Sequence, residues 1–316
     1  MKIRIIFLFL LVILLVGCRG TSRSEEGYVD FRRGTQGLEM RFLERSPPHY
    51  VYEGDFLPIT LELFNRGASE ITQGEIYITG FDPNIIHNNP GADVIVGNLP
   101  APGTPYLFQM FDKKTQFNRE GGYKLLEFNS GRLELPLGTH KYNIPLTVYA
   151  CYDYETIAST EICMDPEPHR SYHDKPCVTR NVGMGGGQGA PVAVTNVELT
   201  NMRNQMRITF NIQNVGSGLS GGTIIDLQRM QQGACPTGFG PADIDVVYLE
   251  NVKVGNQVIT SSCAPSGRIK LVNGFGRVSC TAAIPAGTAY KTPLEITLYY
   301  GYRSHIKRNV EIRGFN

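Results

Sequence analysis

Two cysteines and two histidines lie close together in the segment CMDPEPHRSYHDKPC, the stretch of the chain that is richest in reactive side chains. Cys163, His169, His173 and Cys177 carry thiol and imidazole groups, which are the ligands that hold tetrahedral zinc. Their spacing matches no standard zinc motif, and the prolines between them exclude a regular helix that would place both histidines on one face. We therefore expect a disulfide between Cys163 and Cys177, with a metal site as the less favoured alternative.

The remaining histidines and the glycine-rich run do not point to catalysis. The histidines outside this cluster are scattered singly, and a lone histidine is more often solvated or hydrogen-bonded than a general base. The run GMGGGQG at 183–189 lacks the Lys-Ser/Thr pair that a phosphate-binding loop needs. We expect a protein that is not an enzyme and that binds no cofactor and no metal.

The first residues of the chain indicate export. Lys2 and Arg4 precede an apolar run from Ile5 to Val16, which is too short to cross a bilayer core, since that takes roughly 20 residues. A short basic region followed by a short apolar region and a small residue is typical of a signal peptide. We assign residues 1–17 to this peptide.

The residues at the predicted cleavage site resemble the lipobox of prokaryotic lipoproteins. The sequence there is Leu-Val-Gly-Cys, which ends at Cys18. The resemblance implies that Cys18 becomes the mature N-terminus and carries lipid, whose acyl chains hold the protein at a membrane. Residues 18–36 then form a lipidated cysteine and a solvated tether. The alternative is an ordinary secreted protein with a cysteine there by chance.

The charge balance argues against one class of partner, and the cysteine content predicts disulfides. The chain has 30 basic and 29 acidic residues, and this balance argues against a nucleic-acid partner, which requires a clustered basic surface. Six cysteines follow Cys18, and an even number in an exported chain predicts disulfides.

Two segments of the chain are nearly the same. ITLELFNRG at 59–67 and ITFNIQNVG at 208–216 both alternate apolar and polar residues and end in an Asn-x-Gly turn. Each is followed by a second strand pattern, and the later segments ELPLGT and AIPAGT also match in order. We infer two copies of one domain, at 37–182 and 191–316, joined by a glycine-rich linker at 183–190. Convergent strand patterning is the alternative.

Both copies are predicted to be antiparallel β-sandwiches. Many short strand patterns are separated by glycine and proline turns, and helical periodicity is nearly absent. Tyrosines recur at the matching ends of the two copies, and we expect them to pack across a sheet. Tyr149 and Tyr152 of the first copy align with Tyr299 and Tyr302 of the second, and Tyr154 and Tyr300 lie in the same two clusters.

The other four cysteines allow several pairings. Cys263 and Cys280 flank the predicted hairpin RIKLVNGFGRV, which would bring them together across the strands. Cys151 and Cys235 are left over, one in each copy, so they either bridge the two copies or remain free.

Longer stretches suggest relatives. VYEGDFLPITLELFNRGAS resembles the opening of immunoglobulin-like, adhesion-related (CARDB-like) domains of prokaryotic surface proteins. Together with the lipobox, the segments ITGFDP, CYDYET and QGAPVAVT are similar to a set of uncharacterised archaeal surface lipoproteins. The resemblance covers about residues 37–316 and implies two tandem immunoglobulin-like sandwiches in a cell-envelope or adhesion protein.

These observations predict a protein on the extracellular face of the cell membrane. It is lipid-anchored and non-enzymatic, and its partner is the membrane together with another envelope protein or a surface polymer. The alternative is a solute- or polysaccharide-binding accessory lipoprotein of a transporter or secreted enzyme. That alternative predicts a concave pocket lined by aromatic side chains.

Overall fold

The computed structural model describes residues 31–88, 97–100, 103–170, 175–185, 187–202, 204–216 and 222–315. The contacts of the chain form two units, Met1–Asp30 and Phe31–Asn316, and the description concerns the second unit. The predicted signal peptide, Cys18 and His173 lie outside the described residues.

The regular secondary structure of the described chain is almost entirely β-strand, which confirms the predicted all-β class. The one α-helix in the described ranges is α2, Leu227–Gln231, and η1, Thr260–Ser262, is a single 3-10 turn. The strands are β1 Leu38–Phe42, β2 Tyr50–Tyr52, β3 Phe56–Asn65, β4 Ile71–Thr79, β5 Ile86–Asn88, β6 Gly97–Asn98, β7 Tyr106–Phe111, β8 Tyr123–Leu133, β9 Lys141–Met164, β10 Val182–Gly183, β11 Val192–Met202, β12 Gln205–Asn214, β13 Thr223–Ile225, β14 Val246–Val254, β15 Gln257–Val258, β16 Gly267–Lys270, β17 Phe275–Ala283 and β18 Tyr290–Arg313.

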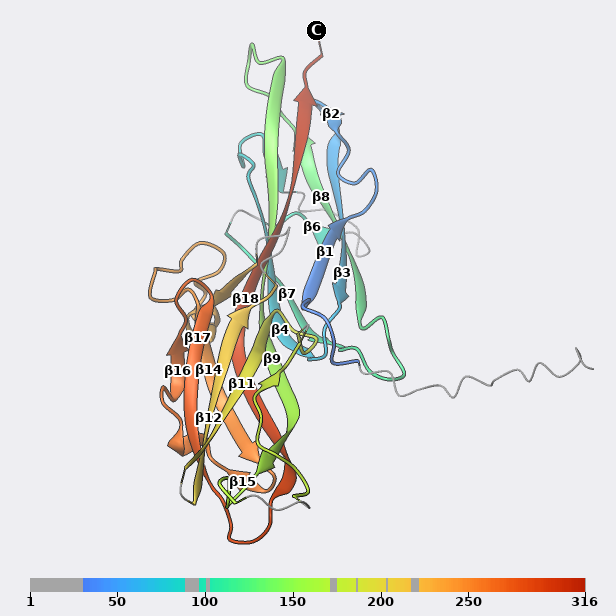
Figure 1. Cartoon of the computed structure of the whole chain (residues 1–316). Helices are drawn as coiled ribbons and strands as arrows, with labels where there is room; N and C mark the ends of the chain where they lie inside the picture. Colours follow the sequence, from blue (N-terminus) through green and yellow to red (C-terminus); the bar gives the residue numbers. More distant parts are fainter. Residues whose placement is uncertain are drawn as a thin grey trace, which may run out of the picture. The chain divides into compact units, whose positions relative to one another are not determined.

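These strands form three mostly antiparallel sheets (Figure 1). A five-stranded sheet has the order β1-β3-β8-β5, with β6 also paired to β8, and a four-stranded sheet has the order β10-β11-β12-β17. The third sheet has nine strands, with β15-β14-β18-β9-β4-β7 as its main path. In this sheet β13 and β2 also pair with β18, and β16 pairs with β14.

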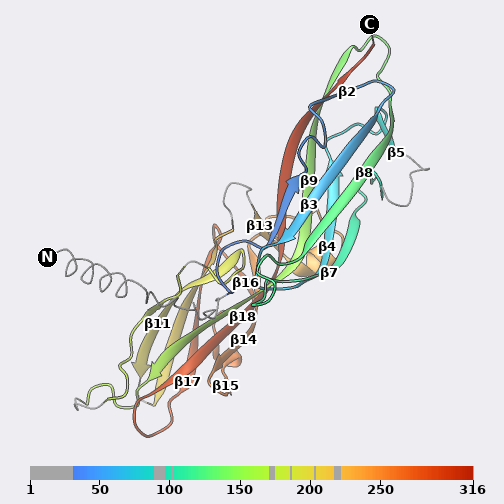
Figure 2. The same cartoon turned by 90° about the vertical axis from the view of Figure 1, so that its right-hand side faces the viewer.

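The nine-stranded sheet is organised around two long strands. β9 and β18 each contain 24 residues and pair antiparallel from Met164 with Tyr290 to Lys141 with Arg313, without a shift of register. Figures 1 and 2 show β1, β3 and β8 beside one end of this pair and β11, β12 and β17 beside the other. We call these two regions the first and second lobes. Each lobe therefore contains half of β9 and half of β18.

The two lobes share this pair although the sequence places β9 in the first copy and β18 in the second. In the first lobe β4 pairs with residues 147–152 of β9, and in the second lobe β14 pairs with residues 294–299 of β18. The predicted division of the chain at 183–190 stays a prediction. In the described part of that segment, Gly189 accepts a hydrogen bond from Ala68 N–H, and the Gln188 side chain bonds to the backbone of Val194.

The alternation of apolar and polar residues along the strands produces the hydrophobic core. In β3, Leu57, Ile59, Leu61 and Leu63 are completely buried, and in β12 the apolar residues from Met206 to Ile212 are buried in the same way. The intervening polar residues are partly or fully exposed, as expected of strands with one wet face. Most buried apolar side chains of both lobes belong to one hydrophobic cluster, with members from Leu38 to Ile312, and a second, smaller cluster surrounds the Cys151–Cys235 disulfide. The opening similarity between 59–67 and 208–216 thus places equivalent strands in the two lobes.

A group of four buried tyrosines lies at the middle of the β9–β18 pair. Tyr152 and Tyr154 face Tyr302 and Tyr300 across the two strands, and the ring centroids of neighbouring tyrosines lie 5.9 to 6.5 Å apart. Burial raises the pKa of all four phenols far above their ordinary value, so they stay protonated and must find hydrogen-bond partners.

The hydrogen bonds of these tyrosines repeat between the lobes. Tyr154 bonds to Asn65 Oδ1 at 3.2 Å, and Tyr302 bonds to Asn214 Oδ1 at 3.1 Å. Both asparagines belong to the Asn-x-Gly turns that end the matching segments of the sequence.

The other two hydroxyls accept bonds from equivalent first strands. Leu38 N–H donates to Tyr152 at 3.1 Å, and Val192 N–H donates to Tyr300 at 3.3 Å. By these bonds Tyr302 is the counterpart of Tyr154, whereas the sequence alignment matched Tyr302 with Tyr152. The expected packing of the tyrosines across the sheet holds for all four of these rings.

Removing either repeated hydroxyl is expected to destabilise the fold. Tyr154→Phe removes a donor from the buried Asn65 oxygen and Tyr302→Phe removes one from the partly buried Asn214 oxygen, so we expect each to lower the free energy of unfolding by about 1–2 kcal/mol. Urea unfolding followed by circular dichroism measures the change. The matched control is Tyr149→Phe, because the Tyr149 ring is only partly buried and its hydroxyl bonds to no described residue. An equal loss in the control would contradict this account.

Candidate binding site

The six described cysteines form three disulfides. Cys163 pairs with Cys177 and Cys263 with Cys280, with Cα atoms 5.9 and 4.0 Å apart, and these are the two pairs expected from the sequence. Cys151 on β9 pairs with Cys235, which follows α2, with a Cα–Cα distance of 6.4 Å. Of the two possibilities left open for this last pair, the structure shows the bridge.

The cysteine-histidine segment is arranged as a closed loop. The Cys163–Cys177 disulfide uses both thiols that a zinc site would need as thiolates. His169 is exposed in the loop, and His173 lies outside the described residues. Within the described ranges, no three His, Cys, Asp or Glu side chains are grouped closely enough to hold a metal ion.

No helix in the described part of the chain combines the length and the apolar character needed to cross a membrane.

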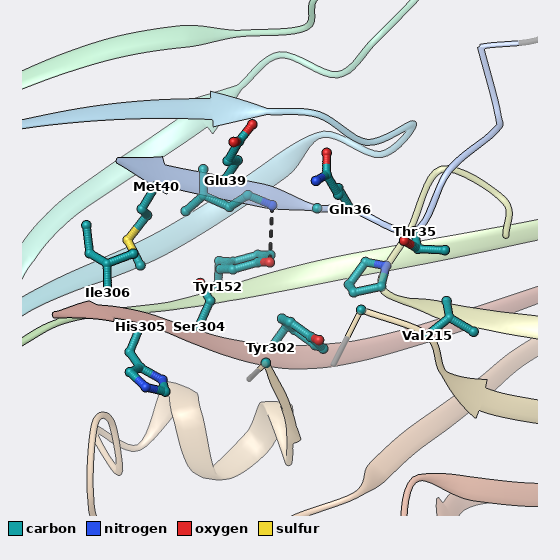
Figure 3. A pocket seen from close by; sticks show the side chains of 15 residues that line it. Thr35, Gln36, Glu39, Met40, Tyr152, Val215, Tyr302, Ser304, His305 and Ile306 are labelled. Atoms are coloured by element: carbon teal, nitrogen blue, oxygen red, sulfur yellow. Dashed lines mark hydrogen bonds between the residues drawn. The ribbon is translucent and has the colours of Figure 1, made fainter. Parts of the chain in front are cut away.

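A cavity of about 330 Å³ lies between β1 and β18, beside the buried tyrosines (Figure 3). Its walls come from parts of the sequence that lie far apart, namely residues 35–40, 152, 191, 215–216, 222 and 302–306. The lining residues are Thr35, Gln36, Gly37, Leu38, Glu39, Met40, Tyr152, Pro191, Val215, Gly216, Gly222, Tyr302, Ser304, His305 and Ile306.

The cavity combines an apolar wall with a few polar groups. Met40 of β1 and Ile306 of β18 lie near each other, and Tyr152 and Tyr302 lie beside them (Figure 3). Leu38 adds to the apolar lining. Apolar walls with a small number of placed polar groups are typical of ligand sites, and this volume lies at the lower end of their usual range.

One glycine and one serine shape the tyrosine side of this cavity. A Cβ atom on Gly222 would collide with the ring of Tyr302, so a larger residue there would displace the tyrosine. Ser304 is 9% exposed, and its Oγ is buried without a hydrogen-bond partner in the described structure. A buried hydroxyl without a partner costs the folded state about 1–3 kcal/mol. The Ser304 hydroxyl is therefore available to bond a ligand or water beside the cavity.

The charged groups on the β1 side of the cavity differ from those on the β18 side. Glu39 on the β1 side is held by Arg41 and by Arg66, whose Nε lies 3.1 Å from a Glu39 carboxylate oxygen. On the β18 side, burial lowers the pKa of His305, and the cations of Lys307 and Arg303 lower it further. The imidazole is therefore neutral at neutral pH, and the fixed charge along this part of β18 is positive.

The geometry of this site favours binding over catalysis. Ser304 and His305 are the nearest candidates for a nucleophile and a base, but they are consecutive residues of one strand. Consecutive side chains of a strand point to opposite faces, so these two cannot form a nucleophile–base pair. The cavity provides a concave surface, apolar contacts and groups that can form hydrogen bonds.

A further sequence pattern was missed by the sequence analysis. Residues 218–222, GLSGG, fit the G-x-S-x-G spacing of the nucleophile elbow. That motif requires a strand followed by a sharp turn into a helix. Here the pattern lies between strand β12 and strand β13, which is not a helix, and Ser220 lies outside the described residues. The spacing alone therefore assigns no catalytic role.

Comparisons with known proteins do not identify a relative. No protein-family model matches the chain, and no curated protein is significantly similar to it. Among solved structures, Escherichia coli alpha-2-macroglobulin activated by porcine elastase aligns at 12% identity with a TM-score of 0.16, over 91% of this chain and 23% of that one. The major capsid protein P2 from bacteriophage PM2 aligns at 9% identity with a TM-score of 0.12, over 86% of this chain and 98% of that one.

This chain thus spans less than a quarter of the macroglobulin chain to which it was compared. Both TM-scores are too low to support an argument about fold or function.

The three disulfides differ in the length of chain that they close, and this predicts different stabilities. Cys151–Cys235 spans 84 residues and Cys163–Cys177 spans 14. By loop-closure entropy, replacing both cysteines of the longer bridge with alanine is expected to cost about 4–5 kcal/mol, and replacing those of the shorter bridge about 3 kcal/mol. Urea unfolding of the two double variants without reductant measures the difference. A larger loss for the Cys163–Cys177 variant would contradict the expected order.

Proposed function

We propose that this protein is an exported, non-enzymatic binding protein, anchored by lipid at Cys18 to the extracellular face of the cell membrane. Three disulfides are consistent with an oxidising, extracellular environment, since such bonds are rare in the cytosol. The lipid anchor rests on the sequence around Cys18, which resembles a lipobox. In this proposal the protein serves the cell envelope as a structural or adhesive component.

We also propose that the two lobes are tandem immunoglobulin-like sandwiches, as the resemblance to prokaryotic surface lipoproteins implies. Two observations support this. Each lobe places a sheet of four or five strands beside its half of the nine-stranded sheet. The equivalent bonds of Tyr154 and Tyr302 also point to duplicated units. The surface lipoproteins in question are archaeal, which is the proposed origin of this chain.

The cavity between β1 and β18 is the observation that carries the binding role. It has apolar walls, buried tyrosines and an unpaired hydroxyl, yet its nearest serine and histidine cannot act together. A protein whose most developed site has this composition is suited to hold a partner rather than to transform a substrate. The partner in this proposal is another envelope protein or a surface polymer.

The anchoring part of the proposal predicts the behaviour of a single variant. Wild-type protein expressed in its native envelope is expected to sediment with membranes and to show the mass of a lipid attached at Cys18. Cys18→Ser is expected to lose that mass and to enter the soluble fraction, because the acyl chains are the only proposed attachment. Ser22→Ala in the same tether is the matched control and should stay with the membranes. Membrane retention of Cys18→Ser would refute lipid anchoring.

A solute- or polysaccharide-binding accessory role is the second candidate, because the cavity is concave and bordered by Tyr152 and Tyr302. This role predicts a measurable heat of binding when envelope oligosaccharides are titrated into the mature protein. Ile306→Phe, which adds a ring to the cavity wall, is expected to abolish that heat. Val258→Phe at the exposed strand β15 is the control and should bind as wild type does. No heat with any oligosaccharide would exclude this candidate.

A further inference from the structure

One stretch of β18 has a neighbouring strand on only one side. β9 pairs with β18 along its full length. On the opposite side, β14 pairs with residues 294–299, β13 with 301–303 and β2 with 311–313. Between β13 and β2, the described structure places no strand against residues 304–310. At about 3.3 Å per residue, this free edge is roughly 20 Å long.

The register of β18 shows which main-chain groups point out of this edge. Glu311 N–H donates to His49 on the side away from β9. Because N–H and C=O directions alternate along an antiparallel strand, His305, Lys307 and Asn309 present their N–H and C=O groups to the same side. None of these groups bonds to a described residue.

Two prolines in the long strands support this assignment. Pro293 of β18 and Pro145 of β9 occupy positions of the same parity, at which the backbone N–H would point away from the β9–β18 ladder. Proline has no N–H, so it is tolerated at these positions without loss of a hydrogen bond between the two strands.

β1 provides a second free edge on the other side of the cavity (Figure 3). β1 pairs only with β3, and the bond from Arg66 N–H to Gly37 fixes which of its residues face away from β3. These are Leu38, whose N–H is taken by Tyr152, and Met40 and Phe42, whose outward groups have no described partner. We call the cavity with these two edges, residues 38–42 and 304–310, the seam.

The loop that follows β1 does not close the β18 edge. The Arg308 side chain points inward, over the ring of Phe42, and donates to the carbonyl oxygens of Ser46 and Pro47 at 3.1 and 3.2 Å. The loop is therefore held by a side chain, and the outward main-chain groups on either side of Arg308 have no partner among the described residues.

The side chains of the seam indicate what kind of strand would fit. Leu38, Met40 and Ile306 present apolar surface toward the cavity. On the outer face of β18, Lys307 is exposed and forms no ion pair with any described residue. The Arg303 guanidinium, two residues before His305, donates to the carbonyl oxygen of Pro236 and lies over the ring of Phe239. An added strand would alternate in the same way, with one face on the apolar wall and the other beside Lys307.

We propose that the seam binds an extended peptide segment of a partner protein, in which apolar residues alternate with acidic ones, by adding it as a strand to β18. The main-chain groups of His305, Lys307 and Asn309 supply the hydrogen bonds, and the cavity takes an apolar side chain. Lys307 attracts the acidic side chains. This inference rests on the proposed binding role and names its site and the class of its partner.

Titration of a fluorescent eight-residue peptide of alternating valine and glutamate into the mature protein tests the proposal. Saturable binding by wild type is expected. Lys307→Pro removes an outward N–H without removing a bond to β9, as Pro293 does naturally, and is expected to weaken binding at least about tenfold. Lys307→Ala is the matched control, since it removes the charge but keeps the N–H, and should weaken binding only about threefold.

Three further peptides make the test independent of whether the proline variant folds. A peptide N-methylated at alternate residues on the edge that faces β18 should bind at least tenfold more weakly to wild type, because it lacks donors. A peptide N-methylated on the opposite edge should bind more strongly than the first. A lysine-for-glutamate peptide should also bind more weakly, and the difference should shrink as salt is added.

Several outcomes would overturn the proposal. They are no binding of the valine-glutamate peptide at 1 mM, equal binding by Lys307→Pro and Lys307→Ala, or equal binding of the two N-methylated peptides. A dimer of wild type in sedimentation that Lys307→Pro dissociates would assign the seam to a second copy and would also refute it. Because these titrations use purified protein, their failure is distinct from a failure of membrane anchoring or of oligosaccharide binding.

Discussion

The structure depends on the uninterrupted pairing of β9 with β18. Backbone hydrogen bonds along 24 residues of each strand join a segment of the first sequence copy to a segment of the second. In each lobe, the part of the nine-stranded sheet contains strands from both sequence copies. Neither copy alone therefore supplies all the strands of a lobe. The continuous hydrophobic cluster and the shared group of tyrosines are direct consequences of that exchange.

The tyrosine group shows how polar atoms are accommodated where the two lobes meet. A phenol buried without a partner would cost the fold more than its ring contributes in packing. Each of the four hydroxyls instead bonds to a turn asparagine, a threonine or the N–H at the start of an equivalent strand. The Asn-x-Gly turn therefore has two structural roles. It ends a strand, and its side-chain oxygen receives a hydroxyl from the central pair.

The same long pair also leaves part of the edge of β18 uncovered, and this edge is the site of the proposed peptide binding. A strand of 24 residues is longer than any of its neighbours on the second side, which are β14, β13 and β2. In the described structure a stretch of this edge, residues 304–310, has no neighbouring strand, and the cavity lies beside it. Exposed strand edges attract other chains unless they are covered or charged, and this one carries Lys307. Charge on the edge keeps like molecules apart while it favours an oppositely charged strand.

The sequence alone determined the features that depend on local pattern. Alternation in ITLELFNRG and ITFNIQNVG is enough to specify half-buried strands, and the turn residues specify where they end. The Cys163–Cys177 and Cys263–Cys280 pairs could be proposed because their cysteines flank short loops or hairpins. Tertiary structure decided the rest. The exchange of strands between lobes, the Cys151–Cys235 bridge and the seam all join residues far apart in the chain, and single-strand periodicity carries no information about which edges meet. Periodicity specifies which face of a strand is buried, whereas only the assembled sheets determine which of its hydrogen bonds remain unpaired.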